Sequence, residues 1–126
     1  MTQEHKEILL RDLCGRLPYG VKVLFENKVF SVDYISAIYE EIHLDIPDNY
    51  TVDISDIKPY LFPMSSMTDG EKEEYCQLQQ RVIYNSKGPV SEDVAKYINW
   101  CHKKHLDINN LIPIGLAIDA TGQNVY

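Results

Sequence analysis

The sequence lacks long apolar runs and has few cysteines. Its uninterrupted apolar stretches are a few residues long, far short of the roughly 20 that cross a bilayer. The N-terminal residues 1–7 contain neither the apolar core nor the cleavage site of a secretory signal. The only three cysteines are widely spaced beside apolar residues, which is typical of small hydrophobes in a reducing compartment. We therefore expect a cytoplasmic protein that does not enter a membrane.

The sequence also lacks the short motifs of common enzyme sites. No G-x-x-x-x-G-K-[ST], G-x-G-x-x-G or H-E-x-x-H pattern occurs, which excludes the usual nucleotide-binding and zinc-protease signatures. No G-x-S-x-G elbow surrounds Ser65 or Ser66, so serine hydrolysis is not indicated. The acids after residue 44 do not fit the calcium loop D-x-[DN]-x-[DN]-G, and Pro47 interrupts them. We expect no cofactor.

Basic residues are missing from one interval of the chain. No Lys or Arg occurs between Lys28 and Lys58, and the other twelve acids of the chain equal its twelve Lys and Arg in number, so the net charge of −7 arises in this interval. Such a surface repels a phosphate backbone, which argues against direct nucleic-acid binding. The acids of the interval are Asp33, Glu40, Glu41, Asp45, Asp48, Asp53 and Asp56.

The length and composition are those of a single globular domain over 1–126. Hydrophobic residues make up 44% and charged residues 25% of the chain, which is enough for one core. The periodicity predicts an α+β fold: a helix over 1–17, three or four antiparallel strands over 21–57, a connector over 58–67, and two helices with a short buried tail over 68–126. Tight connections predict a strongly curved sheet, for which a small SH3-like barrel is one arrangement.

Local patterns support these elements. Apolar residues recur at helical spacing over 8–17. Glu26 and Asn27 separate two alternating segments and predict a tight hairpin, because Asn tolerates the positive φ of such turns. Thr68 and Glu71 have the spacing of a capping box, in which each side chain accepts a hydrogen bond from the other residue's backbone N–H. A helix is therefore expected to begin at Thr68.

A spaced signature covers most of the chain. It consists of LPYGVK at 17–22, DIKPYL and PMSSMT within 56–68, and LIPIGLA at 111–117. With this signature the chain resembles a family of small uncharacterised proteins carried by bacterial phages, prophages and other mobile elements. The resemblance implies an intracellular protein of bacterial or phage origin, and it implies no particular activity, cofactor or catalytic residue. The acidic stretch around 45–51 is longer here than is usual in that family.

Cys101, His102 and His105 are the best candidates for metal or nucleophile chemistry. Cys101 and His105, at i and i+4 of a helix, would share a face as two zinc ligands do. A structural zinc site needs about four ligands, however, and Cys14 and Cys76 offer no CxxC spacing. Cys101 beside a histidine is also the only local pairing for cysteine catalysis. The competing interpretation, a core cysteine followed by exposed histidines at a helix end, is favoured.

Without a catalytic constellation, the segregated acids favour a protein-binding function. The residues expected to contact a protein partner are Glu40, Glu41, Asp45, Asp48, Asp53, Asp56, Tyr60 and Phe62. Tyr60 and Phe62 also have a structural interpretation, as part of an apolar lid between the sheet and the helices, and this is favoured. Two other functions stay open: a nucleic-acid mimic that blocks a basic groove, and a small metal- or cysteine-dependent enzyme that uses Cys101 and His105.

Overall fold

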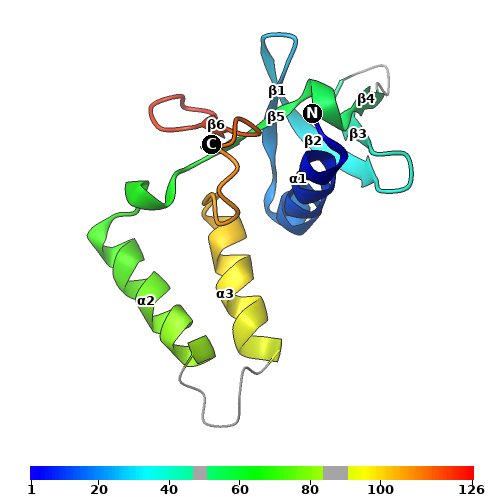
Figure 1. Ribbon diagram of the computed structural model, residues 1–126. Helices are drawn as coiled ribbons and strands as arrows, with labels where there is room; N and C mark the ends of the chain where they lie inside the picture. Colours follow the sequence, from blue (N-terminus) through cyan, green and yellow to red (C-terminus); the bar gives the residue numbers. More distant parts are fainter. Residues whose placement is uncertain (47–50, 84–90) are drawn as a thin grey trace.

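The computed structural model of the protein describes residues 1–46, 51–83 and 91–126. Figure 1 shows helix α1 beside a sheet, and an α2–α3 pair that extends away from it. The α+β class and the order of helix, sheet and two helices are confirmed. The elements are α1 (Gln3–Arg16), β1 (Lys22–Phe25), β2 (Lys28–Ser36), β3 (Glu41–Leu44), β4 (Thr51–Asp53), β5 (Lys58–Leu61), α2 (Asp69–Ile83), α3 (Ser91–Lys103) and β6 (Ile118–Asp119).

Helix α1 begins and ends at residues suited to those positions. The Thr2 hydroxyl accepts a hydrogen bond from the N–H of His5 (3.1 Å), which satisfies one of the free donors of the first turn. The inner face carries Leu9 and Leu13, which are fully buried. After Arg16 the chain enters the short 3₁₀ turn η1 (Leu17–Tyr19), whose proline lies in its first turn, where its missing N–H is tolerated.

Strands β1 and β2 form the hairpin predicted at Glu26 and Asn27. These residues have φ angles of 48° and 63°, the left-handed backbone that a two-residue type I′ turn requires. Asn adopts this backbone readily, whereas Glu is strained by roughly 1–2 kcal/mol there. The hairpin thus holds Glu26 in a conformation that its residue type does not favour.

Further along β2, a bulge between Val32 and Tyr34 shifts the pairing of this strand with β3.

The sheet is larger than the three or four strands predicted. It has six strands in the order β4-β3-β2-β1-β5-β6. The added strands come from the expected connector and tail: β5 pairs antiparallel with β1, and β6 pairs parallel with β5. After the β1–β4 meander, the 3₁₀ turn η2 (Ile54–Asp56) returns the chain to β1. The small SH3-like barrel considered from the sequence stays a prediction.

The core lies between α1, one face of the sheet and the C-terminal tail. Ile42 and Leu44 face inward, as their alternation with polar residues in the sequence predicts, with 0% and 2% of their surfaces exposed. Burying a side chain of this kind contributes about 1.5–3 kcal/mol, so each of these residues stabilises the β region. The buried cluster comprises Leu9, Leu13, Val21, Val23, Val32, Ile42, Leu44, Val52, Ile54, Ile57, Leu61, Leu111, Leu116 and Ala117.

The tail is fixed to the core by one buried carboxylate. Asp107 accepts hydrogen bonds from the N–H groups of Leu111 (2.7 Å) and Ile112 (2.9 Å). Ala120 then donates its N–H to the carbonyl of Leu61 (2.8 Å), beside the β5–β6 pairing. The tail is therefore partly buried, as its apolar sequence predicted, but it also adds a strand to the sheet.

Helices α2 and α3 form a pair that projects from the sheet (Figure 1). The predicted capping box opens α2: Thr68 N–H donates to Glu71 Oε1 (3.0 Å), and Glu71 N–H donates to Thr68 Oγ1 (3.2 Å). The Tyr75 and Tyr97 hydroxyls lie 2.8 Å apart in a hydrogen bond that joins the two helices.

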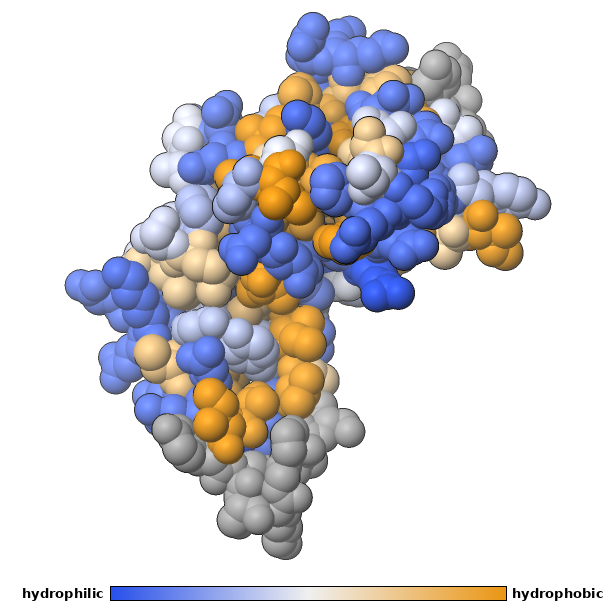
Figure 2. Space-filling view, viewed as in Figure 1, coloured by the Kyte–Doolittle hydropathy of each residue, from blue (hydrophilic) through white to orange (hydrophobic). Residues whose placement is uncertain are grey.

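No residue of α2 is buried, and Figure 2 shows apolar side chains gathered near the end of the α2–α3 pair. Within the described ranges, no helix has both the length and the apolar character of a bilayer span. The turn-forming residues at 85–89 of the sequence predict a break between the two helices, and this segment lies outside the described residues.

Candidate functional site

The acids of the β region lie on the outer surface of the strands and in their connections. Asp33 on β2, Asp53 on β4 and Asp56 in η2 are exposed, and Glu41 on β3 is half-buried. Glu41 and Asp53 are direct partners in the β3–β4 ladder, so two carboxylates share one face of the sheet. Asp48 lies outside the described residues. The structure therefore concentrates negative charge where β3 meets β4.

Two of the predicted binding acids hold the fold together locally. Glu40 Oε1 accepts a hydrogen bond from Gln3 Nε2 (2.8 Å), which joins the β2–β3 connection to α1. Asp45 Oδ1 accepts a hydrogen bond from the N–H of Ser31 (2.8 Å), which joins the end of β3 to β2. Both carboxylates already have a partner inside the protein.

Asp53 caps the 3₁₀ turn η2. Its Oδ1 accepts hydrogen bonds from the Ser55 hydroxyl (2.6 Å) and the Ser55 N–H (2.9 Å). The Ser55 hydroxyl bond, followed by the backbone bond, holds the pKa of Asp53 below its usual value, so this carboxylate is ionised at neutral pH. Asp53 thus combines a structural role with a permanent charge.

Other carboxylates near the β1–β2 turn, β3 and η2 are free to meet a ligand. Within the part of the chain that the structure describes, Glu26, Glu41 and Asp56 form neither a hydrogen bond nor an ion pair through their side chains. Glu26 and Asp56 are exposed, and Glu41 is half-buried. Among the described residues, these side chains and the exposed Asp33 on β2 carry uncompensated charge, whereas Glu40, Asp45 and Asp53 accept hydrogen bonds inside the protein.

An apolar tip lies next to these acids. In the β2–β3 connection, which projects from the sheet in Figure 1, Ile38 is 88% exposed and Tyr39 is 72% exposed. On the outer face nearby, the ring of Tyr34 stacks on His43 with centroids 3.6 Å apart and an angle of 20° between the planes. Large apolar side chains this exposed are common where proteins bind one another.

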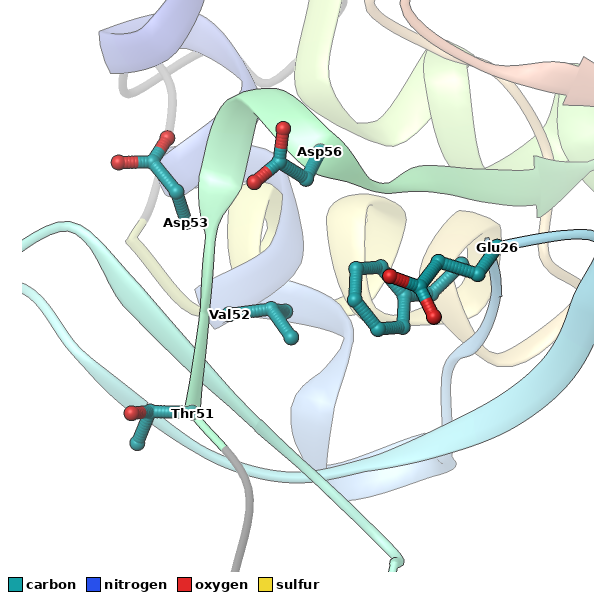
Figure 3. Close-up of a pocket in the computed structure, with 6 residues that line it drawn as sticks. Glu26, Thr51, Val52, Asp53 and Asp56 are labelled. Carbon is teal, nitrogen blue, oxygen red and sulfur yellow. The ribbon is translucent and has the colours of Figure 1, made fainter.

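A pocket of about 390 Å³ lies between β4 and the β1–β2 turn. Figure 3 shows Thr51, Val52 and Asp53 along β4, Asp56 above them in η2, and Glu26 on the opposite wall. The Asp53 carboxylate turns toward the outer side of β4, while Glu26 extends toward the space between the walls (Figure 3). The mouth of this pocket is therefore acidic. Its lining residues are Phe25, Glu26, Thr51, Val52, Asp53 and Asp56.

A second pocket, of about 300 Å³, adjoins the first and is mostly apolar. It shares Phe25 and Glu26 with the first pocket and adds Lys28, Phe30 and Ile46. The Phe25 and Phe30 rings lie 6.4 Å apart at 56°, a tilted contact that forms its floor. We call the two pockets together the hairpin groove. Sequence reasoning missed Phe25, Phe30 and Ile46, because only the hairpin turn and the curvature of the sheet bring them together.

Tyr60 and Phe62 belong to the interior side of the protein. Tyr60 is 6% exposed, and its carbonyl accepts a hydrogen bond from the Tyr126 hydroxyl (2.8 Å). Phe62 is half-buried, with its ring 6.0 Å from that of Tyr126. Tyr60 therefore cannot contact a partner, and the lid interpretation of this segment is the better one.

Helix α3 ends at Lys103, before it reaches His105. The N–H of His105 donates to the carbonyl of His102 (3.0 Å), and the N–H of Leu106 donates to that of Cys101 (3.0 Å), the two bonds of a Schellman C-terminus. His105 has a φ of 57°, at the position where helices usually carry glycine. The prediction that Cys101 and His105 share a helix face is therefore wrong, because the chain turns between them.

A buried polar cluster lies where α1 meets this turn. Arg16 pairs with Asp12 one turn earlier in α1, through Nε–Oδ2 at 2.7 Å and Nη2–Oδ1 at 3.0 Å. The same Nη2 donates to the carbonyl of Leu106 (2.6 Å), and Asn109 Nδ2 donates to Asp12 Oδ1 (2.9 Å). Charged side chains thus join α1 to the segment after α3. The i, i+4 spacing of the two charges was visible in the sequence, but their burial was not.

Burial next to this cluster sets the protonation of the candidate catalytic residues. Burial, followed by the nearby Arg16 charge, lowers the pKa of His102 and lowers that of His105 to about 4, so both imidazoles are neutral at pH 7. Burial raises the pKa of Cys101 to about 11. The thiol is therefore protonated and shielded from solvent, the opposite of an activated nucleophile.

The two alternative interpretations of the histidines and cysteines also need correction. His102 is 6% exposed and His105 is half-buried, so neither is the exposed helix-end histidine expected. Cys14 and Cys76 are exposed, so only Cys101 packs as a small hydrophobe. Among the residues that the structure describes, no three His, Cys, Asp or Glu side chains are grouped as metal ligands are.

Comparisons of the chain with protein-family models, curated proteins and solved structures returned no match. The functional assignment therefore depends on the geometry of the site. Two features carry it: the exposed tip beside Glu41, and the hairpin groove with its free carboxylates on Glu26 and Asp56.

Proposed function

We propose that this chain is a non-enzymatic, intracellular accessory protein of a phage or other mobile element, and that it binds a protein partner through its acidic face. The acidic face comprises Ile38, Tyr39, Glu41, Asp53 and Asp56. The spaced signature in the sequence supports the origin. The exposure of Ile38 and Tyr39 beside a free carboxylate is the observation that carries the binding function.

The physical reason is the combination of apolar contact with charge of one sign. Exposed Tyr and Ile side chains supply the buried contact area from which interfaces gain most of their free energy. The ionised Asp53, with Glu41 and Asp56, which have no partner among the described residues, selects a partner with a basic surface and speeds its association. Neither feature requires a bound cofactor or a reactive group.

A nucleic-acid mimic is supported less well. A mimic presents its carboxylates free and regularly spaced, as phosphates are along a duplex. Here Glu40, Asp45 and Asp53 already accept hydrogen bonds from Gln3, Ser31 and Ser55, so three of the acids are used inside the protein. The enzyme alternative is weakened by the protonated, buried thiol of Cys101.

Zero-length cross-linking tests the proposed function directly. A carbodiimide joins a carboxylate to a lysine that touches it, so a partner captured from a bacterial lysate should carry a lysine linked to Glu41 or Asp56. We expect capture to fall at least tenfold for Glu41→Gln combined with Asp56→Asn, and for Ile38→Ser combined with Tyr39→Ser. Glu73→Gln, an exposed acid on α2, is the matched control and should leave capture unchanged.

Three results would count against the proposal. Cross-links that map only to α2 or α3 would place the partner on the helix pair. Equal capture by the wild type and the Glu41→Gln/Asp56→Asn variant would exclude the acidic face as the binding surface. A partner that duplex DNA competes away from Glu41 and Asp56 would favour the mimic instead.

A further inference from the structure

The hairpin groove indicates the chemistry of the partner. We propose that it binds an extended peptide segment in which an Arg or Lys lies two residues from a large apolar residue. This inference rests on the proposed function, because Asp53 and Asp56 belong both to the groove and to the acidic face. It adds a substrate chemistry and places the contact at the β1–β2 hairpin.

The spacing follows from the two adjoining pockets. Because Phe25 and Glu26 line both pockets, a ligand that fills one can reach the edge of the other. In an extended chain, residues two apart point to the same side and lie roughly 6.6 Å from each other. One side chain can therefore enter the acidic pocket while the next one on the same side enters the apolar pocket.

The acidic pocket selects a cation. Within the described residues, Glu26 and Asp56 have no hydrogen-bond or ion-pair partner. Asp53, whose carboxylate turns toward the outer side of β4, remains ionised at neutral pH and adds to the negative charge nearby. Arg suits this pocket better than Lys, because its planar guanidinium binds carboxylates through two parallel hydrogen bonds and stacks on aromatic rings such as that of Phe25. Lys28 lines the apolar pocket and is not among the residues that line the acidic one.

The apolar pocket selects a side chain of the size of Leu, Ile or Met. Phe25, Phe30 and Ile46 line it, and its volume of about 300 Å³ is at the lower end of ligand pockets. An acidic or strongly polar residue in this position would lose its hydration without gaining a partner. The groove therefore prefers basic-plus-apolar segments over purely basic ones.

Two other occupants fit less well. A hard divalent cation takes six or more oxygen ligands, whereas only Glu26 and Asp56 supply free carboxylates among the lining residues that the structure describes. The Asp53 carboxylate is bonded to Ser55 and turns toward the outer side of β4. A nucleic-acid strand would be repelled by the same charges. Both are outcomes that the test below can report.

The test is a titration of the ¹⁵N-labelled protein with defined peptides, followed by NMR. The probe is acetyl-Gly-Arg-Ser-Leu-Gly-amide, and the comparison peptides replace its Arg by Ser, its Leu by Ser, or its Arg by Glu. We expect saturable shift changes at the amides of Phe25, Glu26, Phe30, Ile46 and Asp53, with at least tenfold weaker binding for each comparison peptide. MgCl₂ and a DNA oligonucleotide are titrated in parallel and should leave these amides unchanged.

Glu26→Asn separates binding from folding. Asn accepts the left-handed backbone of the turn better than Glu, so this variant should keep or raise the melting temperature. Its affinity for the probe peptide should fall about tenfold. Asp56→Asn in the exposed η2 turn should lower the affinity for the probe peptide by a similar factor. Glu73→Gln removes the same charge from α2 and should bind the peptide as the wild type does.

The possible results separate the inference from the proposed function. Equal binding of the peptide with Ser in place of Leu, shifts confined to other elements, or normal binding by Glu26→Asn would overturn the inference. If cross-links form at Glu41 while the probe peptide leaves the groove unshifted, the proposed function stands and the groove assignment falls. If the peptide fills the groove but substitutions at Glu41 and Asp56 leave the capture of a partner from lysate unchanged, the groove chemistry stands and the partner-binding role falls.

Discussion

Arg16 and Asp12 form an ion pair that is completely removed from solvent: Nε and Oδ2 are 2.7 Å apart, and both side chains are 0% exposed. Removing one partner of such a pair strands the other charge and typically costs about 3–5 kcal/mol, while replacing both with apolar residues is far less harmful. We predict that Asp12→Leu strongly destabilises the protein and that the added Arg16→Met restores much of the loss. Urea unfolding measures both. Losses that simply add would contradict this account.

Gly15 on α1 faces His102 on α3 at a distance that excludes a methyl group. A Cβ on Gly15 would lie 2.5 Å from His102 Cε1, and the buried imidazole cannot swing into solvent. We predict that Gly15→Ala costs about 1–3 kcal/mol in the wild type, as overpacking does. In a His102→Ala background the same change should stabilise the protein by up to about 1 kcal/mol, because Ala favours helix more than Gly does. Equal effects in both backgrounds would rule out the contact.

His105 makes the stability depend on pH in a defined window. The fold lowers its pKa from 6.5 to about 4, mainly through burial and secondarily through Arg16, and it lowers that of His102 in the same direction. The folded state therefore favours neutral imidazoles, so their contribution is complete above pH 6.5 and is lost as the pH falls toward 4. Urea midpoints should fall from pH 7.5 to pH 5.

The control for this pH dependence is His105→Asn. Asn tolerates the φ of 57° at this position but does not titrate. The variant should show a shallower fall of the urea midpoint between pH 7.5 and pH 5. An unchanged slope would assign the pH dependence to other groups.

The three cysteines should differ in reactivity. Cys14 and Cys76 are exposed, while Cys101 is buried and its pKa is raised to about 11. Compared with a thiol of pKa 9, this lowers the thiolate fraction about 100-fold, before any effect of restricted access. We predict that iodoacetamide at pH 8 modifies Cys14 and Cys76 in the native protein, and Cys101 only in urea. Peptide mass mapping locates the adducts, and rapid native modification of Cys101 would contradict the structure.

Glu41 faces Asp53 across β3 and β4, a like-charge pair that opposes folding. Such pairs change stability by roughly 0.2–1 kcal/mol, so Glu41→Gln should raise the unfolding midpoint slightly while it weakens partner capture. Opposite changes in stability and binding would indicate that the charge is kept for function. A fall in stability instead would mean that Glu41 has a structural role.

Local features of this protein were readable from sequence because their causes lie within a few residues. The hairpin at Glu26 and Asn27 and the capping box of Thr68 and Glu71 each depend on one turn of backbone, and each formed as expected. The lid role of Tyr60 was weighed correctly against an exposed one. Which acids are bonded inside the protein could not be predicted in the same way. The sequence shows their charge, but only the fold distinguishes Asp45, which is bonded, from Asp56, which has no partner among the described residues.

The sequence by itself determined the α+β class, the order of the helices and the concentration of negative charge in the β region, since periodicity, turn chemistry and composition are local properties. Tertiary structure alone decided three things that depend on contacts between distant residues. It paired β5 and β6 with the sheet, it buried Arg16 beside the turn at Leu106, and it set Glu26 opposite Asp56 across the hairpin groove. Residues far apart in the chain meet only after the sheet has curved, and for that reason the groove was not visible in the sequence.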